Sequence, residues 1–288
     1  MTRPALSFEF FPPKSLAGSF RLWDSVHALA PLGPEFVSVT YGAGGTTRQL
    51  THEAVTTIDK TTGLKVAAHL TCVDASRAET LEIADSYARA GITDIVALRG
   101  DAPKGDAAFT PHTDGFANSV ELIEALAETG NFTLRVGAYP EKHPEAADAD
   151  ADVAYLKRKI DAGAAAAITQ FFFEADTFFR FRDRCVAAGI DAPIIPGVLP
   201  VENWKGASKF AKATGTSIPA EISQGFENAQ TEADHDLLAT ALASELCDDL
   251  LRGGVEHLHF YTLNKPDLTQ NVCRALGIAP RPRLQEVA

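Results

Sequence analysis

Short apolar runs that alternate with helical segments are the feature that most constrains the fold of this chain. Eight runs have the length and composition of buried strands, and each is followed by a segment with helical spacing of its apolar residues. The runs cover residues 7–11, 36–40, 65–70, 95–98, 133–138, 166–170, 194–199 and 257–261. An open doubly wound sheet usually stops at about five or six strands, so eight such units in 288 residues predict a closed (β/α)8 TIM barrel.

The segments between these runs predict the helices. Gly91, Gly163 and Gly189 each follow a helical segment directly, as is typical of a helix C-terminus. Helices are expected over residues 20–30, 77–90, 117–127, 147–162, 177–188 and 268–276, with one more after the loop 41–47 and a longer helical stretch over 203–212 and 234–252. No linker or repeat interrupts this order, so we expect one barrel domain over residues 1–288 and no regulatory domain.

Composition excludes several classes of protein. The formal net charge of −12 at pH 7 argues against a nucleic-acid partner, which requires a basic face. No apolar run approaches the roughly 20 residues of a membrane-spanning helix, and the N-terminus lacks the apolar stretch of a signal peptide. The four cysteines are far apart and form no CxxC pair, which is typical of reduced thiols. We therefore expect a soluble, cytoplasmic protein that binds neither a membrane nor nucleic acid.

Polar residues gather where the predicted strands end. In barrels of this kind the chemistry takes place at the C-terminal ends of the strands. Seven of the eight ends carry a side chain that can form a hydrogen bond or titrate: Glu9, Thr40, His69, Arg99 with Asp101, Tyr139, Gln170 and Tyr261. This concentration favours an enzyme or a ligand-binding protein over a purely structural barrel, in which chance alone would supply several such residues.

The strand over residues 95–98 delivers a cation, a flexible turn and a carboxylate in succession. These are Arg99, Gly100 and Asp101, and together they are typical of one wall of an active site. The alternative is an ordinary polar turn in which Arg99 and Asp101 pair with each other in solvent.

Glu9 lies between Phe8 and Phe10, so strand alternation places it on the opposite face from both rings. A carboxyl group that points into a barrel loses its water, and desolvation raises its pKa towards the range of a general acid. The alternative is a buried carboxylate paired with a lysine or an arginine. We favour the general acid because Glu9 stands at a strand end.

Two other patterns favour a structural explanation. The glycine-rich loop 41–47 has Thr47 where the third glycine of a dinucleotide fingerprint would stand, so we expect a tight loop beneath a ligand. His257 and His259 share one face of the last predicted strand. Because the chain shows no zinc-like ligand spacing, we expect no metal and interpret both histidines as polar positions at the entrance of the strand.

Two patterns in the second half leave alternatives open. Asp152 and Lys159 lie two turns apart on the same side of a predicted helix, with Tyr155 between them. They indicate either a binding surface or a solvated flank with local ion pairs. Three phenylalanines follow Gln170 at residues 171–173, and they predict either an apolar wall beside a polar anchor or an aromatic plug between barrel and helices.

Eight sequence motifs occur in a fixed order along the chain. They are SFEFFPP at 7–13, FVSVTYG at 36–42, HLTC at 69–72, LRGD at 98–101, AYPE at 138–141, ITQFF at 168–172, PGVLP at 196–200 and HFYTLN at 259–264. With these motifs the chain resembles methylenetetrahydrofolate reductase of the bacterial single-domain type, from about residue 6 to residue 277. The regulatory domain of eukaryotic relatives has no counterpart in this sequence.

The resemblance implies a barrel that binds FAD without a Rossmann fold. NAD(P)H would reduce the flavin and leave, and 5,10-methylenetetrahydrofolate would then take the hydride at the same face, giving 5-methyltetrahydrofolate in a ping-pong reaction. The resemblance makes Glu9 the general acid that helps to open the folate ring. It places Asp101 near the flavin, where a carboxylate would favour a cationic iminium.

The resemblance also implies the contacts of each ligand. Gln170 would contact the pterin, and Phe210 would move to stack on either substrate. The implied cofactor-binding residues are Tyr41, Ala43, His69, Arg99, Gly100, Asp101, Phe116, Ala117, Tyr139, His143, Asp152, Arg158 and Lys159. The implied substrate-binding residues are Thr40, Asp101, Gln170, Phe210, Tyr261 and Lys265.

Three positions depart from the pattern of the family. Lys265 stands where many relatives carry arginine, which replaces a two-point carboxylate contact by a single charge. Gly206 replaces a side-chain amide, and Phe116 replaces a tyrosine beside the flavin. The alternatives from other classes are a pterin-binding methyltransferase barrel without flavin, and a folate- or flavin-binding protein without turnover. The sequence leaves open a monomer or a homo-oligomer.

Overall fold

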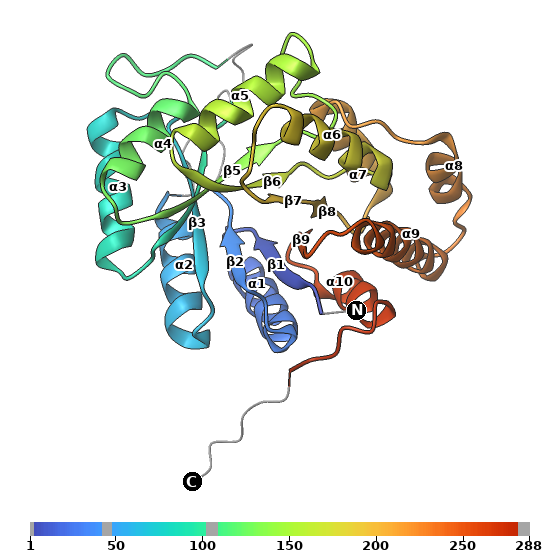
Figure 1. Ribbon diagram of the computed structural model, residues 1–288. Helices are drawn as coiled ribbons and strands as arrows, with labels where there is room; N and C mark the ends of the chain where they lie inside the picture. Colours follow the sequence, from blue (N-terminus) through green and yellow to red (C-terminus); the bar gives the residue numbers. More distant parts are fainter. Residues whose placement is uncertain (1–2, 42–47, 102–108, 282–288) are drawn as a thin grey trace.

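Nine parallel strands form a single sheet in the computed structural model, which describes residues 3–41, 48–101 and 109–281. Their order is β7-β6-β5-β4-β3-β2-β1-β9-β8. The strands are β1 (Ala5–Phe10), β2 (Phe36–Val39), β3 (Val66–Thr71), β4 (Asp94–Leu98), β5 (Thr133–Ala138), β6 (Ala164–Thr169), β7 (Ile194–Ile195), β8 (Gly197–Val198) and β9 (His257–Tyr261). The first strand in the sequence therefore lies beside the last, as Figure 1 shows for the blue β1 and the red β9.

The ring closes at Pro196, which divides the predicted strand over 194–199 into β7 and β8. Proline has no N–H to donate, so it interrupts the ladder. β7 pairs with β6 and β8 pairs with β9, while the backbone N–H of His259 donates to the carbonyl of Pro196 at 3.0 Å. The two ends of the sheet meet there, and the predicted (β/α)8 barrel is confirmed with one of its eight strands split in two.

Helices surround the sheet and follow its strands in chain order (Figure 1). They are α1 (Leu16–Leu29), α2 (Arg48–Thr62), α3 (Arg77–Arg89), α4 (Ser119–Glu128), α5 (Ala149–Asp161), α6 (Ala175–Ala187), α7 (Trp204–Thr214), α8 (Ala220–Asn228), α9 (Glu232–Arg252) and α10 (Pro266–Ala275), with a 3-10 turn η1 (Ala30–Leu32) after α1. The helical stretch predicted over 203–252 is three helices, and α8 was not predicted. Gly215, at φ 74°, ends α7, and Thr231 begins α9 with a capping box to Asp234.

The main core lies between the barrel and its helices. The outward-facing Phe8 and Phe260 are fully buried there, with their ring centroids 6.2 Å apart. A smaller cluster lies among inward-facing residues: Phe36, Ala67, Val96, Ala166, Ile168 and Ile195. Burial of apolar area is the dominant stabilising contribution to folding, so most of that stabilisation comes from the outer layer.

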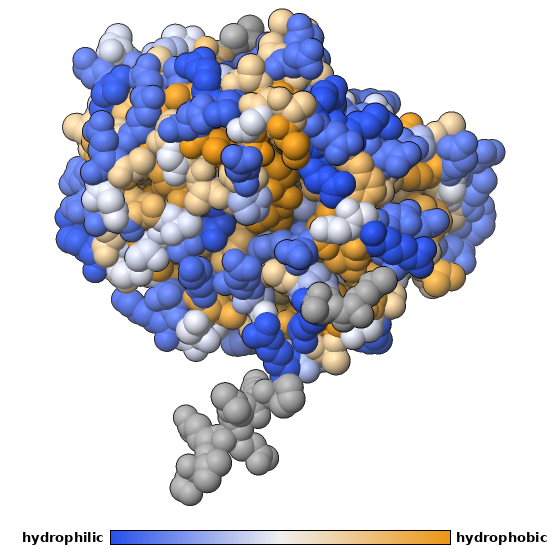
Figure 2. Space-filling model, viewed as in Figure 1, coloured by the Kyte–Doolittle hydropathy of each residue, from blue (hydrophilic) through white to orange (hydrophobic). Residues whose placement is uncertain are grey.

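The outer surface is mostly hydrophilic in the view of Figure 2, with hydrophobic residues gathered near the centre of that face. Within the described ranges, no helix has the length and apolar composition needed to cross a membrane. All four cysteines are buried and free.

Candidate active site

The carboxylate of Glu9 lies inside the barrel between two histidines. Its Oε2 is 3.3 Å from Nε2 of His69 on β3 and 3.8 Å from Nε2 of His259 on β9. Both contacts are ion-pair distances, and neither Nε2 atom has a hydrogen-bond partner among the described residues. Only 15% of the Glu9 side chain is exposed. The alternative in which a lysine or arginine pairs with Glu9 is therefore wrong for the part of the chain that the structure describes.

These histidines overturn the prediction that burial raises the pKa of Glu9. Burial is the largest single influence and acts upward, but the interactions with His259 and His69 together outweigh it and lower the pKa of Glu9 to about 2. Burial also lowers the pKa of His259, against the opposing effect of Glu9. At neutral pH Glu9 is therefore an ionised carboxylate that must first receive a proton before it can donate one.

Hydrogen bonds continue from His259 towards the other end of the barrel. Nδ1 of His259 is 2.8 Å from Oγ of Ser7, and the same Oγ is 2.9 Å from Nε2 of His257. Burial, and then the charges of His259 and Arg135, lower the pKa of His257 to about 4. The two histidines share a face as predicted. His257 does begin its strand, but His259 is fully buried in mid-strand, so the prediction that it lies at the entrance is wrong.

A cavity of about 660 Å³ lies where β3, β4 and β5 end. Its lining includes Thr71, Leu98 and Ala138, the last residues of those strands. The predicted site residues that line it are Tyr41, Arg99, Gly100, Asp101, Ala117, Tyr139, His143, Asp152, Lys159, Gln170 and Phe210. The cavity thus brings together residues from five separate strand ends and four helices, at the end of the barrel where chemistry is expected.

Lys159 turns from α5 towards this cavity. Its Nζ donates to the carbonyl of Gly137 at 2.9 Å, and burial, opposed by Asp152, lowers the pKa of Lys159 to about 8. Asp152 accepts the backbone N–H of His143 at 2.8 Å. The alternative of a solvated helix flank is therefore wrong for Lys159, whose ammonium faces a cavity without a full complement of acceptors.

Arg99 is held by an acid that the sequence did not indicate. Its guanidinium donates to both carboxylate oxygens of Glu145, at 2.5 and 2.9 Å, and this interaction raises the pKa of Arg99. The alternative in which Arg99 pairs with Asp101 is therefore wrong. Glu145 lies in the segment between β5 and α5, and no periodicity or motif marks it as a partner of Arg99.

The three consecutive phenylalanines after Gln170 serve different parts of the molecule. Phe171 is buried and stacks on Phe210 of α7, with ring centroids 5.7 Å apart and planes at 22°. Phe172 packs into the outer core, where it stacks on Phe178. Phe210 is 51% exposed and lines the cavity, so the apolar wall and the aromatic plug are both present.

The other predicted site residues lie outside the lining of this cavity, and Ala43 lies outside the described residues. Thr40 follows β2 and accepts at its carbonyl from Thr51, Phe116 is buried beneath the guanidinium of Arg77, and Arg158 lies over the ring of Tyr155. Tyr261 donates to the carbonyl of Thr169 at 2.6 Å. Lys265 lies 3.3 Å from Glu202. Glu9 and His69 belong to the cluster inside the barrel.

The described residues contain no group of three or more His, Cys, Asp and Glu side chains that could hold a metal ion.

Comparison with known proteins gives a consistent result. A family model described as methylenetetrahydrofolate reductase matches residues 1–277. The chain is 47% identical over 276 residues to the 5,10-methylenetetrahydrofolate reductases of Salmonella typhimurium (strain LT2) and Escherichia coli (strain K12), covering 96% of this chain and 91% of each relative. It is 35% identical to methylenetetrahydrofolate reductase (NADH) 1 of Arabidopsis thaliana, covering 97% of this chain and 49% of that protein.

Among solved structures, an uncharacterized protein from Clostridium thermocellum described as binding two copies of 5-methyl-5,6,7,8-tetrahydrofolic acid has the same fold. The TM-score is 0.61 at 14% identity, covering 96% of this chain and 95% of that one. A family match over almost the whole chain and relatives at 47% identity lead to one conclusion: this chain belongs to the methylenetetrahydrofolate reductase family.

Proposed function

We propose that this protein reduces 5,10-methylenetetrahydrofolate to 5-methyltetrahydrofolate with NAD(P)H as the hydride donor and non-covalently bound FAD as the carrier. The observation that carries the proposal is the cavity at the strand ends, towards which the ammonium of Lys159 turns with the carbonyl of Gly137 as its hydrogen-bond partner. Family membership supports the folate substrate. The plant relative named for NADH supports a nicotinamide as the donor.

The residues around the cavity fit a flavin dinucleotide. A volume of about 660 Å³ lies within the range of roughly 300–1,000 Å³ that is typical of ligand sites. Lys159 is a partly buried cation whose desolvation is costly unless an anion compensates it, and a diphosphate would do so. His143 and Tyr139 pack edge to face beside it, with ring centroids 4.6 Å apart. FAD bound there would accept a hydride from the nicotinamide and pass it to the folate.

Phe210 provides an adaptable wall for two substrates that use one site in turn. Its ring is half exposed and rests on the buried Phe171, so it can move without opening the core. A planar nicotinamide and a planar pterin would each stack on such a ring. Gln170 lines the same cavity and offers an amide that can donate to and accept from a pterin.

Glu9 delivers the proton that opens the folate ring. The departing nitrogen is a poor leaving group unless it is protonated, so ring opening requires an acid. Because His259 and His69 keep Glu9 ionised, it acts by passing a proton on rather than by storing one. Asp101 lines the cavity as an exposed carboxylate and would stabilise the cationic iminium that ring opening creates.

The test combines spectroscopy with rapid mixing. The purified protein should carry flavin absorbance that denaturation releases into solution as free FAD. Anaerobic addition of NADH or NADPH should bleach this absorbance, and 5,10-methylenetetrahydrofolate should then restore it. A colourless preparation that fails to take up added FAD would contradict the cofactor. Bleaching that folate does not reverse would contradict the substrate.

A further inference from the structure

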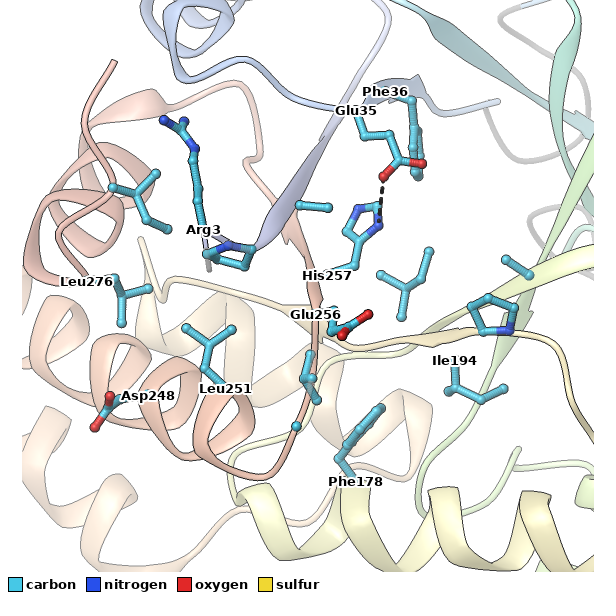
Figure 3. Close-up of a pocket in the computed structure, with 18 of the residues that line it drawn as sticks. Arg3, Glu35, Phe36, Phe178, Ile194, Asp248, Leu251, Glu256, His257 and Leu276 are labelled. Atoms are coloured by element: carbon cyan, nitrogen blue, oxygen red, sulfur yellow. Dashed lines mark ion pairs between the residues drawn. The ribbon is translucent and has the colours of Figure 1, made fainter. Parts of the chain in front are cut away.

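A second and larger cavity lies at the opposite end of the barrel from the candidate active site. Its volume is about 1650 Å³, and its lining includes the first residues of five strands: Ala5, Phe36, Thr133, Ile194 and His257. We call it the base cavity. Figure 3 shows the carboxylate of Glu35 and the ring of His257 pointing towards each other at this cavity.

A series of polar side chains leads from the base cavity to Glu9, with hydrogen bonds on both sides of Ser7 and longer contacts at its two ends. Oε2 of Glu35 is 3.6 Å from Nδ1 of His257, whose Nε2 is 2.9 Å from Oγ of Ser7. The same Oγ is 2.8 Å from Nδ1 of His259, whose Nε2 is 3.8 Å from Oε2 of Glu9. Exposure of the side chains falls from 57% at Glu35 to 15% at His257 and to zero at Ser7 and His259. Every member of the series can both accept and give up a proton.

We propose that these five side chains form a relay that supplies Glu9 with protons from the base cavity, so that proton and folate reach Glu9 from opposite ends of the barrel. The inference rests on the proposed function. It assigns a role to His257 and Glu35, which lie outside the cavity proposed for FAD and folate.

The transfer is balanced at each step. The ionised carboxylate of Glu9 takes the proton of Nε2–H of His259 and passes it to the departing folate nitrogen. Nδ1 of His259 takes the proton of the Ser7 hydroxyl, Ser7 takes Nε2–H of His257, and Nδ1 of His257 takes a proton from Glu35 or from solvent in the base cavity. Every group ends with as many protons as it had at the start, and no electrons move along the relay. The relay leaves both rings as Nδ1–H. Once the folate product has left, Glu9 takes up a proton from solvent at the strand ends, and the same transfers in reverse restore Nε2–H on both rings and release a proton into the base cavity.

The proposed reaction requires such a supply. Hydride transfer from NAD(P)H to methylenetetrahydrofolate consumes one proton in each turnover, because the folate nitrogen ends protonated. A folate bound over the strand ends would fill the space through which water could otherwise reach Glu9. The lowered pKa values favour an ionised Glu9 and a neutral His259, so Glu9 depends on its neighbour for the proton that it donates.

The charges around the relay favour proton transfer between neutral imidazole rings. Arg135 pairs with Asp94, lies 4.1 Å from the ring of Phe36, and lines the base cavity. Together with burial, its positive charge disfavours a second cation on His257. His69 contacts Glu9 from the side opposite to His259 and is not part of the series. A neutral His257 is free to accept a proton at one ring nitrogen while it donates from the other.

The kinetic test separates the two half-reactions. Stopped-flow mixing of the reduced holoenzyme with methylenetetrahydrofolate, in H₂O and D₂O, measures the step that needs the proton. His257→Leu should slow this step by about 10- to 100-fold, below the roughly 10²–10⁴-fold of general acid catalysis itself, and should increase the solvent isotope effect. Reduction by NAD(P)H, which takes up no proton through Glu9, should be unchanged.

Glu35→Gln should slow the same step by less, because solvent can still reach His257. Its matched control is Glu256→Gln, a carboxylate on the wall of the same cavity outside the relay, which should behave as wild type. Equal folate rates and isotope effects in His257→Leu and wild type would overturn the relay while leaving the proposed function intact. A wild-type protein without either half-reaction would instead overturn the proposed function.

Chemical rescue distinguishes proton transfer from mere filling of space. In His257→Ala, imidazole can enter from the base cavity and should restore the folate step. 1-Methylimidazole has similar size and basicity but lacks the second ring nitrogen needed to pass a proton along, so it should not rescue. Equal rescue by both compounds would overturn the relay.

A spectroscopic measurement tests the relay without turnover. The relay can transfer a proton only if Ser7 donates to one ring and accepts from the other. This requires His257 and His259 to be in the same tautomeric form. ¹⁵N NMR of the imidazole nitrogens at neutral pH should therefore show both rings as Nε2–H, or both as Nδ1–H. Opposite tautomers on the two rings would overturn the proposal.

Discussion

The two faces of β1 and β9 differ in composition and in what they contact. Facing outwards, Leu6, Phe8 and Phe260 are apolar, buried and packed against the helices. Facing inwards, Ser7 and Glu9 meet the histidines of β9. Successive residues along one strand thus alternate between packing in the apolar core and polar contacts inside the barrel.

This difference shows how a barrel can hold reactive groups without losing its fold. A TIM barrel usually fills its interior with branched apolar residues. Here the apolar filling is confined to a cluster that includes Val96, Ile168 and Ile195, and the β9–β1 side is polar. Because the outer layer supplies most of the burial, the inner layer is free to carry groups that packing alone would not select. Substitutions on the two faces should therefore have separable effects.

The largest expected effect is on catalysis, at an inward position. Glu9→Gln keeps the size of the side chain but cannot donate a proton as an acid, so the folate half-reaction should slow by about 10²–10⁴-fold. Reduction by NAD(P)H should proceed as in wild type, because it needs no acid. Stopped-flow absorbance of the flavin measures both steps. Reoxidation of Glu9→Gln by folate at the wild-type rate would show that Glu9 is not the acid.

The next effect is on stability, at the outward neighbour. Phe8→Ala removes a fully buried ring and should lower the free energy of unfolding by about 3–5 kcal/mol. Urea unfolding followed by circular dichroism measures it. Phe20→Ala is the matched control, since Phe20 is 62% exposed and should change stability by no more than about 0.5 kcal/mol. A comparable loss in both variants would remove the distinction between the faces.

Acid should destabilise the protein through the inward face. His257 has a pKa of about 4 in the folded protein against 6.5 as its ordinary value, so the unfolded chain takes up a proton first as the pH falls. Stability is fully present above pH 6.5 and is lost progressively towards pH 4, by about 3 kcal/mol at roughly 1.4 kcal/mol per pKa unit. His259, whose pKa is also lowered, acts in the same direction.

Urea titrations at pH 7 and pH 5 test this dependence. His257→Leu should show a smaller loss between the two values than wild type does. An identical loss in both proteins would place the acid sensitivity elsewhere.

The smallest expected effect is on FAD binding, and it compares two lysines of helix α5. Lys159 faces the candidate cofactor cavity, whereas Lys157, two residues earlier on α5, pairs with Asp161 on the outside. Lys159→Met should weaken FAD binding by about tenfold, the equivalent of one charge-assisted hydrogen bond of roughly 1.5 kcal/mol, and Lys157→Met should leave it unchanged. Fluorescence titration of the flavin-free protein with FAD measures both. Equal affinities in the two variants would remove Lys159 from the cofactor site.

The sequence predicted the barrel well because short apolar runs alternate with helical segments, several of which end at a glycine. It missed α8, whose apolar residues Ile222 and Phe226 stand in a mostly polar segment. The sequence also predicted one continuous strand over residues 194–199. It did not predict the break at Pro196, because closure of the ring there depends on the strands on both sides. A local sequence pattern predicts local structure, whereas helix α8 and the break at Pro196 depend on tertiary packing.

The site was less accessible to prediction, for the same reason. The pKa of Glu9 was misjudged because its partners His69 and His259 are remote in sequence and only the barrel brings them together. Glu145 was missed because a loop conformation, not a motif, brings it to Arg99.

The junction between β7 and β8 limits which residues the chain tolerates. A Cβ on Gly197 would lie 2.2 Å from the carbonyl oxygen of Thr169 and 2.6 Å from the ring of Tyr261, which donates to that same carbonyl. Any side chain at Gly197 would force these two apart. The ring is closed here by two-residue strands, so slow-exchanging amides should be scarce between residues 194 and 198. Local opening of the barrel should therefore occur first at the junction between β7 and β8, beside the histidines of β9.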